Sequence, residues 1–132
     1  MPNTYSVLVI DDSAEIRIIL TRFLKTFGFE KVDAAENGRI GVDKSRLLKP
    51  DIIFLDGVMP EMDGITALPQ IKKESPNSIV IVSSSLTEKA RILQFKEAGA
   101  DFYLLKPYER EKFEDVVRTA IAFLEDRQRS LS

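Results

Sequence analysis

The fold of this chain is decided by one stretch, Asp51-Ile52-Ile53-Phe54-Leu55-Asp56, in which an apolar run ends at a carboxylate. Uninterrupted apolar runs of this length are typical of strands that are buried on both faces of a parallel sheet. In open α/β sheets, ligands bind outside the carboxyl ends of the strands. Asp56 is therefore the first candidate for a functional side chain.

Three further strands follow the same pattern, and polar residues stand at the end of each. The run at 6–10 precedes Asp11 and Asp12, the run at 78–83 leads into the serines at 83–85, and the run at 102–105 precedes Lys106. A weaker strand is predicted at 31–35. Amphipathic stretches between the strands predict helices, with Ser13 as a cap of the first, at 13–27, 39–48, 65–74, 88–98 and 109–126.

Five alternating strands and helices predict an α/β fold with a parallel sheet covered by helices on both faces. Right-handed crossovers reduce the possible topologies to a few. No repeat, low-complexity tract or linker divides the sequence. We therefore expect a single domain over 1–132, with its core at about 5–124 and a polar tail at 125–132 whose end frays.

The composition excludes several kinds of chemistry. The chain has 132 residues, a net charge of −2, and neither cysteine nor histidine. Disulfides, thiol catalysis and histidine-based acid–base catalysis are excluded, and any bound metal must be held by oxygen, which favours magnesium, manganese or calcium. Without a basic excess, a signal peptide or a membrane-length apolar run, we expect a cytoplasmic protein that does not bind nucleic acid or membrane directly.

The polar residues at the strand ends suggest phosphoryl chemistry. Three neighbouring carboxylates repel one another unless a cation is present, and a hard divalent ion supplies that charge. Aspartate carboxylates can act as nucleophiles and form aspartyl phosphates. Lys106 could pair with Asp56 or with phosphate oxygens, and a serine hydroxyl could donate a hydrogen bond to the same oxygens.

Each of these residues also has a simpler interpretation. An aspartate after a strand is often only a helix cap, which describes Asp11 or Asp12 equally well. A single lysine at a strand end is usually a solvated charge, and a run of serines usually belongs to a turn. The functional hypothesis rests on their joint placement at four strand ends.

The sequence resembles the receiver domain of two-component response regulators over about 5–124. Three segments carry the resemblance: Val7-Leu8-Val9-Ile10-Asp11-Asp12, then Asp56-Gly57-Val58-Met59-Pro60-Glu61-Met62-Asp63-Gly64, then Ala98-Gly99-Ala100-Asp101-Phe102-Tyr103-Leu104-Leu105-Lys106-Pro107. The resemblance implies a flavodoxin-like, doubly wound (βα)5 fold with sheet order 2-1-3-4-5. It also implies that the protein is a signalling switch, without turnover of a separate substrate.

The resemblance assigns roles to individual residues. Asp56 matches the phosphoacceptor, and Asp11 and Asp12 match the acidic pair that holds Mg²⁺ (or Mn²⁺), Asp12 directly and Asp11 partly through water. The backbone carbonyl of Val58 matches a further metal ligand. Lys106 matches the lysine that contacts the phosphoryl group, and in the family the peptide bond before the next proline is often cis.

The hydroxyl that senses the phosphate is one of two serines. The family's spacing to Lys106 selects Ser84 with Ser85 as its small neighbour, and Ser83 is the alternative if the strand ends one residue earlier. Tyr103 matches the aromatic residue that changes rotamer when this hydroxyl moves. In the family, the surface of helix 4, strand 5 and helix 5 then binds a partner.

Two features depart from the usual pattern. Pro69 lies inside the predicted third helix, where it removes a backbone donor and favours a kink. Gly57 follows the phosphoacceptor, and the nearby Val58 and Leu86 are apolar. We expect Val58 and Leu86 to shield an acyl phosphate from water.

The resemblance implies a sensor histidine kinase, a histidine phosphotransfer protein or a small phosphodonor as the source of the phosphoryl group. The target would be a protein, and the chain a monomer that can dimerise when phosphorylated. Alternatives are a receiver cut from a larger regulator with a DNA-binding or enzymatic output, and an interaction module that works without phosphate. A hydrolase with an aspartyl nucleophile is disfavoured because Val58 stands where such enzymes carry a second aspartate.

Overall fold

The computed structural model describes residues 3–131. Its five strands form one parallel sheet in the order β2-β1-β3-β4-β5, as predicted. The strands are β1 (Asn3–Ile10), β2 (Phe29–Ala35), β3 (Ile52–Asp56), β4 (Ile79–Ser84) and β5 (Phe102–Leu105). The helices are α1 (Ala14–Thr26), α2 (Gly38–Leu48), α3 (Gly64–Glu74), α4 (Lys89–Glu97) and α5 (Arg110–Leu131).

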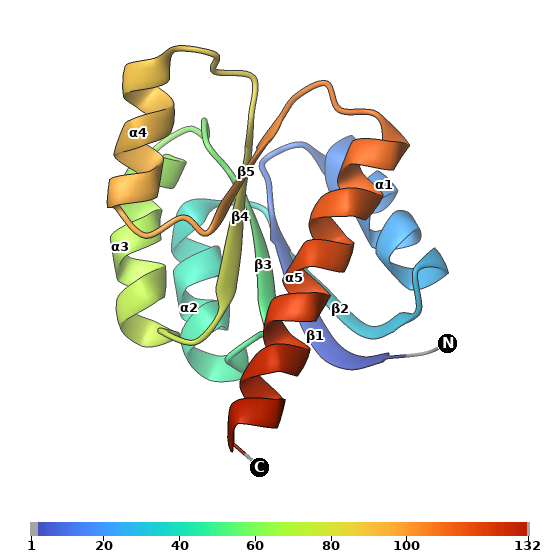
Figure 1. Ribbon diagram of the computed structural model, residues 1–132. Helices are drawn as coiled ribbons and strands as arrows, with labels where there is room; N and C mark the ends of the chain where they lie inside the picture. Colours follow the sequence, from blue (N-terminus) through green and yellow to red (C-terminus); the bar gives the residue numbers. More distant parts are fainter. Residues whose placement is uncertain (1–2, 132) are drawn as a thin grey trace.

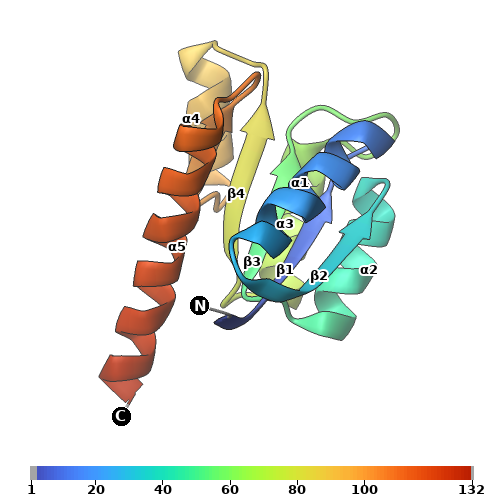
Figure 2. The ribbon, with the colours of Figure 1, turned by 90° about the vertical axis from the view of Figure 1, so that its right-hand side faces the viewer.

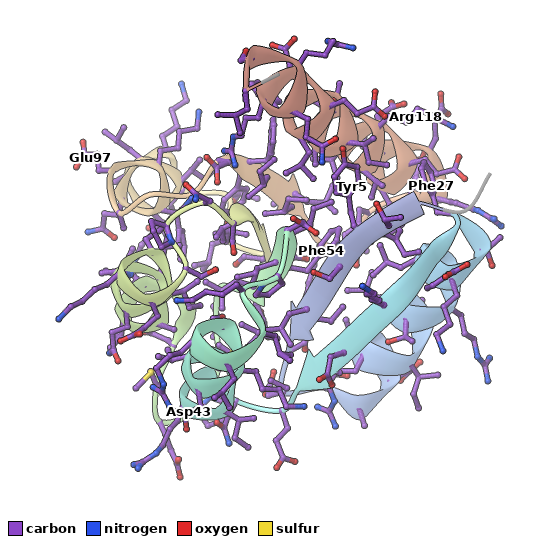
Figure 3. All side chains as sticks on the ribbon, turned by 90° about the horizontal axis from the view of Figure 1, so that it is seen from below. Tyr5, Phe27, Asp43, Phe54, Glu97 and Arg118 are labelled. Carbon is purple, nitrogen blue, oxygen red and sulfur yellow. The ribbon has the colours of Figure 1, made fainter. Side chains whose placement is uncertain are left out.

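The sheet lies between two layers of helices. Figure 1 shows α1 and α5 on one face and α2, α3 and α4 on the other. Each face has its own apolar cluster: Phe54 and Phe113 belong to the cluster under α1 and α5, and Leu55 and Phe95 to the cluster under the other three helices. Seen from below, Phe54 lies between the layers, whereas Asp43 and Glu97 lie on the outside (Figure 3).

The two central strands explain why continuous apolar runs predicted this fold. Every residue of β3 and of β4 is buried. Side chains alternate between the two faces of a strand, so both faces of β3 and β4 must be apolar to contact both helix layers. The parallel register then brings the strand ends together, with Asp56 beside Ser83 and Ser84 beside Leu105.

Polar caps fix where the helices after β1 and β3 begin. The Ser13 side chain accepts a hydrogen bond from the amide of Ile16, which confirms the predicted cap of α1. Asp63 caps α3 in the same way through the amide of Thr66. Such bonds satisfy backbone donors that have no partner inside the helix. They leave the loops that carry Asp11, Asp12 and Asp56 at one edge of the sheet.

The C-terminal helix is longer than predicted. We expected it to end at Asp126 and the remaining polar residues to fray, but α5 continues to Leu131 and reaches past the end of the sheet (Figure 2). Asp126 pairs with Arg129 at 3.1 Å, and Arg127 donates to the carbonyl oxygen of Asn77 at 2.6 Å. Ser132 lies outside the described residues. Among those described, no helix is both long and apolar enough to cross a lipid bilayer.

Pro69 does not divide the third helix. It lies in the middle of α3, which continues on both sides of it from Gly64 to Glu74. The side chain is exposed, so the proline ring displaces no core residue. The missing backbone donor of Pro69 therefore does not end the helix.

The left-handed residue at the end of α2 can be tested by substitution. Lys49, the residue after the helix, has a left-handed conformation with φ of 46°, which costs an L-residue free energy that glycine does not lose. We expect Lys49→Gly to be more stable than Lys49→Ala by about 1 kcal/mol in urea unfolding. Ala122→Gly, in the middle of α5, is the matched control, and its free energy of unfolding should be about 1 kcal/mol lower than that of the wild type. Equal stability of the two Lys49 variants would contradict the left-handed conformation.

Candidate functional site

Three carboxylates meet at the carboxyl edge of the sheet. Asp11 and Asp56 are buried and Asp12 is exposed, and one oxygen atom of each lies within 4.8 Å of the others. The loop that carries Asp11 is held in place because Asp11 Oδ1 accepts from the amide of Ser13 at 2.9 Å. Arg17 of α1 donates to the Asp11 carbonyl oxygen at 2.8 Å. The structure therefore brings together the three aspartates that the sequence predicted.

Lys106 supplies the opposite charge. Its Nζ lies 2.8 Å from Asp11 Oδ2 and 3.4 Å from Asp56 Oδ1. Its backbone amide donates to the carbonyl oxygen of Ser84 at 2.8 Å, so the end of β5 sets the position of the ammonium group. The Lys106–Pro107 peptide bond is cis, as the resemblance implied.

One ammonium group does not balance this much negative charge. Burial, and then the charge of Asp11, raise the pKa of Asp56 to about 7, against the opposing effect of Lys106. Burial alone would lower the pKa of Lys106, but hydrogen bonding to Asp11 and the charges of Asp11 and Asp56 raise it overall. Without an added cation, the ionised form of Asp56 is therefore disfavoured relative to a solvent-exposed aspartate, whereas Lys106 remains charged.

The donor set fits a hard divalent cation. It consists of carboxylate oxygens from Asp11, Asp12 and Asp56, which are ligands that Mg²⁺ and Mn²⁺ accept. A cation beside them would offset the repulsion that raises the pKa of Asp56. Asp12, which is exposed, leaves one side of the cluster open to solvent and to a phosphodonor.

The loop after Asp56 packs tightly around it. The Val58 amide donates to Asp56 Oδ1 at 3.2 Å, and the Val58 side chain is 54% exposed. A side chain at Gly57 would begin 2.8 Å from Ser84 Cβ, and one at Gly64 would begin 2.6 Å from the Asp56 carbonyl oxygen. Gly57 therefore fits here because Ser84 of the next strand occupies the adjacent space.

The two candidate serines lie on opposite faces of β4. Ile79 and Ile81 belong to the cluster under α1 and α5, and Val80 and Val82 to the other cluster. By alternation, the Ser83 side chain faces α1 and α5. Ser84 faces the other layer, which its contact with the Gly57 position supports.

Ser84 and Tyr103 both contact the peptide groups of Leu86. Ser84 Oγ accepts from the Leu86 amide at 3.2 Å, and the Tyr103 hydroxyl donates to the Leu86 carbonyl oxygen at 2.8 Å. The Tyr103 ring packs on Phe95 of α4 with a centroid distance of 5.9 Å. Leu86 is thus the physical connection between the strand-end hydroxyl and the aromatic side chain.

Sequence reasoning missed three contributors to this site. In the sequence, Arg17 is one of several charged residues of a predicted helix, and no sequence pattern indicates its contact with Asp11. Leu86 contributes through its backbone amide and carbonyl groups, so the type of its side chain does not indicate this role. Tyr108 follows Lys106-Pro107 directly, and that neighbourhood could have identified it as a residue near the site.

Comparison with known proteins agrees with this geometry. Residues 7–118 match the family model of the response regulator receiver domain. The chain belongs to the response regulator receiver family. A receiver domain of this type is a signalling switch in two-component systems, and phosphorylation and Mg²⁺ binding at an acidic pocket are typical of the family.

Similar proteins include single-domain and multidomain receivers. The chemotaxis protein CheY of Thermotoga maritima is 40% identical over 103 residues, which cover 78% of this chain and 86% of that protein. A protein-glutamate methylesterase/protein-glutamine glutaminase of Archaeoglobus fulgidus is 48% identical over 102 residues, which cover 76% of this chain but only 29% of that enzyme. A chain of the CheX–CheY complex of Borrelia burgdorferi, solved with BeF3 and Mg²⁺, is 33% identical with a TM-score of 0.84 and covers 89% of each chain.

The crowding of carboxylates predicts an unusual effect of Asp56→Asn on stability. Because folding raises the pKa of Asp56 to about 7, its contribution favours the folded protein at low pH and is lost as the pH rises toward that value. In metal-free buffer at about pH 8, Asp56→Asn should be on the order of 2 kcal/mol more stable than the wild type, and this gain should shrink at about pH 5.

Urea unfolding at both pH values, with EDTA and then with Mg²⁺, measures this effect. Mg²⁺ should stabilise the wild type much more than Asp56→Asn, because the cation offsets the same repulsion. Glu36→Gln, which neutralises an exposed carboxylate, is the control and should show neither effect. A metal-free Asp56→Asn protein less stable than the wild type at about pH 8 would contradict this account of the site.

Proposed function

We propose that Asp56 accepts a phosphoryl group from a histidine kinase, a histidine phosphotransfer protein or a small phosphodonor, and that this changes a partner-binding surface. The observation that carries the proposal is the position of Asp56. Its carboxylate is buried, lies beside two further carboxylates, and has Lys106 Nζ 3.4 Å away. The protein would act in the cytoplasm.

In the transfer step, an Asp56 oxygen forms a bond to phosphorus while the bond from phosphorus to the donor atom breaks. Bound Mg²⁺ or Mn²⁺ would neutralise charge on the transferring group, with Asp11, Asp12, Asp56 and the Val58 carbonyl as its protein ligands. Lys106 lies close enough to pair with the new phosphoryl oxygens. This adds about −1.5 to −2 charge and three acceptor oxygens at Asp56.

The switch runs through Ser84, Leu86 and Tyr103. The Ser84 oxygen accepts from the Leu86 amide, so its proton remains free to donate to a phosphoryl oxygen. When Ser84 moves toward the phosphate, Leu86 follows, and the Tyr103 hydroxyl bonded to its carbonyl group moves with it. The loop between β4 and α4 thereby carries the change to the ring that packs on α4.

The surface of α4, β5 and α5 suits a protein partner. Leu93 of α4, Leu105 of β5 and Phe123 of α5 are each between 45% and 54% exposed, and Phe123 packs on Phe102 of β5. Exposed apolar side chains on three neighbouring elements are typical of interaction sites. The occupant would be a downstream protein or, in a dimer, a second receiver.

The test of this function uses BeF3⁻ with Mg²⁺ as a phosphoryl mimic and amide NMR as the readout. In the wild type, signals of the Asp56 loop, the β4–α4 loop and β5 should shift. Ser84→Ala should keep the shifts near Asp56 and lose most of those at Leu86 and Tyr103. Asp56→Ala should lose all of them, and an unchanged response in that variant would refute the proposal.

The lifetime of the phosphoryl group tests the two apolar neighbours. The exposed Val58 side chain and the partly buried Leu86 should hinder access of water to the acyl phosphate. Val58→Asn and Leu86→Glu should shorten the dephosphorylation half-life, measured by loss of the phosphorylated species after donor removal. Val58→Leu is the matched control and should keep the dephosphorylation half-life of the wild type. Half-lives unaffected by either polar substitution would reject shielding.

A further inference from the structure

One buried hydroxyl is left without a hydrogen-bond partner. Among the buried side-chain nitrogen and oxygen atoms of residues 3–131, only Ser83 Oγ has none. Ser83 is 2% exposed, and the strand register places it beside Asp56. Leaving a buried hydroxyl unpaired costs free energy, so this position calls for an explanation.

Tyr108 brings a second hydroxyl to the same place. Its ring stacks on Phe113 of α5 at 6.1 Å, and Phe113 in turn stacks on Phe54 of β3 at 5.5 Å. Burial raises the pKa of Tyr108 to about 12; the neighbouring Ser83 hydroxyl opposes the rise, and the charges of Asp11 and Asp56 add to it. The phenol is therefore a neutral donor beside the face of β4 that carries Ser83, and Ser83 Oγ forms no hydrogen bond with it.

This pair lies on the opposite face of the sheet from Ser84 and Tyr103. Tyr108 packs against the cluster under α1 and α5, and Tyr103 against the cluster under α2, α3 and α4. Neighbouring serines at the end of β4 thus each have a tyrosine beside them, one in each layer. Ser84 and Tyr103 are both hydrogen-bonded to the backbone of Leu86, whereas Ser83 Oγ has no hydrogen-bond partner.

We propose that Ser83 and Tyr108 form a second hydroxyl pair, which closes when Asp56 is phosphorylated and carries the change to the start of α5. The proposal rests on the proposed function of Asp56. Both are positioning residues, because neither would touch the phosphoryl group. They would add α5 and the face it shares with α1 to the surfaces that respond to phosphorylation.

Two contacts supply the mechanical link. Lys106 lies closer to Asp11 than to Asp56, at 2.8 Å against 3.4 Å, so a phosphoryl group on Asp56 draws its ammonium group away from Asp11. Tyr108 is two residues further along the same loop. On the other side, the Gly57 amide donates to the Ser83 carbonyl oxygen at 3.0 Å, so movement of the Asp56 loop reaches Ser83 directly.

The chain offers a direct readout because it has three tyrosines and no tryptophan. Incorporation of 3-fluorotyrosine gives one ¹⁹F signal for each of Tyr5, Tyr103 and Tyr108, assigned by the three Tyr→Phe variants. With BeF3⁻ and Mg²⁺, the Tyr103 and Tyr108 signals of the wild type should both shift. Ser83→Ala should remove at least half of the Tyr108 shift and leave that of Tyr103, and Ser84→Ala should do the reverse.

Two further measurements separate coupling from simple proximity. Tyr108→Phe keeps the stacking on Phe113, and should reduce the amide shifts over 110–117 while preserving those at Leu86. Ser83→Ala removes an unpaired hydroxyl, so its thermal midpoint should be no lower than that of the wild type.

The outcomes distinguish this proposal from the one it rests on. A wild type in which no ¹⁹F or amide signal responds to BeF3⁻ would refute phosphorylation of Asp56 itself. A Tyr103 response beside a Tyr108 shift that Ser83→Ala does not change would overturn only the second pair. A lowered midpoint for Ser83→Ala would also overturn it, because the hydroxyl would then be paired before phosphorylation.

Discussion

The structure depends on the repulsion between buried carboxylates at the end of its central strands. Asp11 and Asp56 lie almost out of solvent, with one lysine between them. Each comes directly after a run of buried apolar residues, 7–10 before Asp11 and 52–55 before Asp56, so the fold cannot relieve the repulsion by moving a strand end without exposing core. The positive charge of a divalent cation at this site would offset the repulsion.

The same constraint explains how a local change can reach the surface. Hydrogen bonds to charged groups contribute about 1.5–3 kcal/mol each, and a shift of a two-state equilibrium from 1:99 to 99:1 needs about 5.5 kcal/mol. Two new hydrogen bonds to a phosphoryl group, from Lys106 and Ser84, would together contribute about 3–6 kcal/mol, which is comparable with that requirement. Ser84 and Tyr103 are both hydrogen-bonded to Leu86, and these bonds would carry the change toward α4 under the proposed function.

Much of this could be predicted from the sequence because parallel strands bring their ends to one edge. The apolar runs located β1, β3, β4 and β5, and the residue after each run located Asp11, Asp56 and Lys106. Alternation along β4 places Ser83 and Ser84 on opposite faces of the sheet. Which helix layer each serine faces follows only from the apolar cluster on each face, because every residue of the run 79–82 is apolar and the sequence does not distinguish the two faces. The spacing in the sequence could therefore select Ser84 only through the resemblance to a family.

Other features depend on contacts between distant residues, which no local pattern carries. The end of α5 is polar, and its last turns are helical with Arg127 bonded to the carbonyl group of Asn77, 50 residues earlier. The ring of Tyr108 stacks on Phe113, which places it in the apolar cluster on the Ser83 face of β4. In both cases the residue type was visible, but the direction of the side chain was set by tertiary packing.

The most direct measurement of the central claim is chemical identification of the phosphorylated residue. After incubation with acetyl phosphate and Mg²⁺, the intact mass should rise by one phosphoryl group, and borohydride reduction should convert a single aspartate, Asp56, to homoserine. EDTA should prevent both changes. Reduction at Asp11 or Asp12 instead, or no mass increase with Mg²⁺ present, would contradict the account.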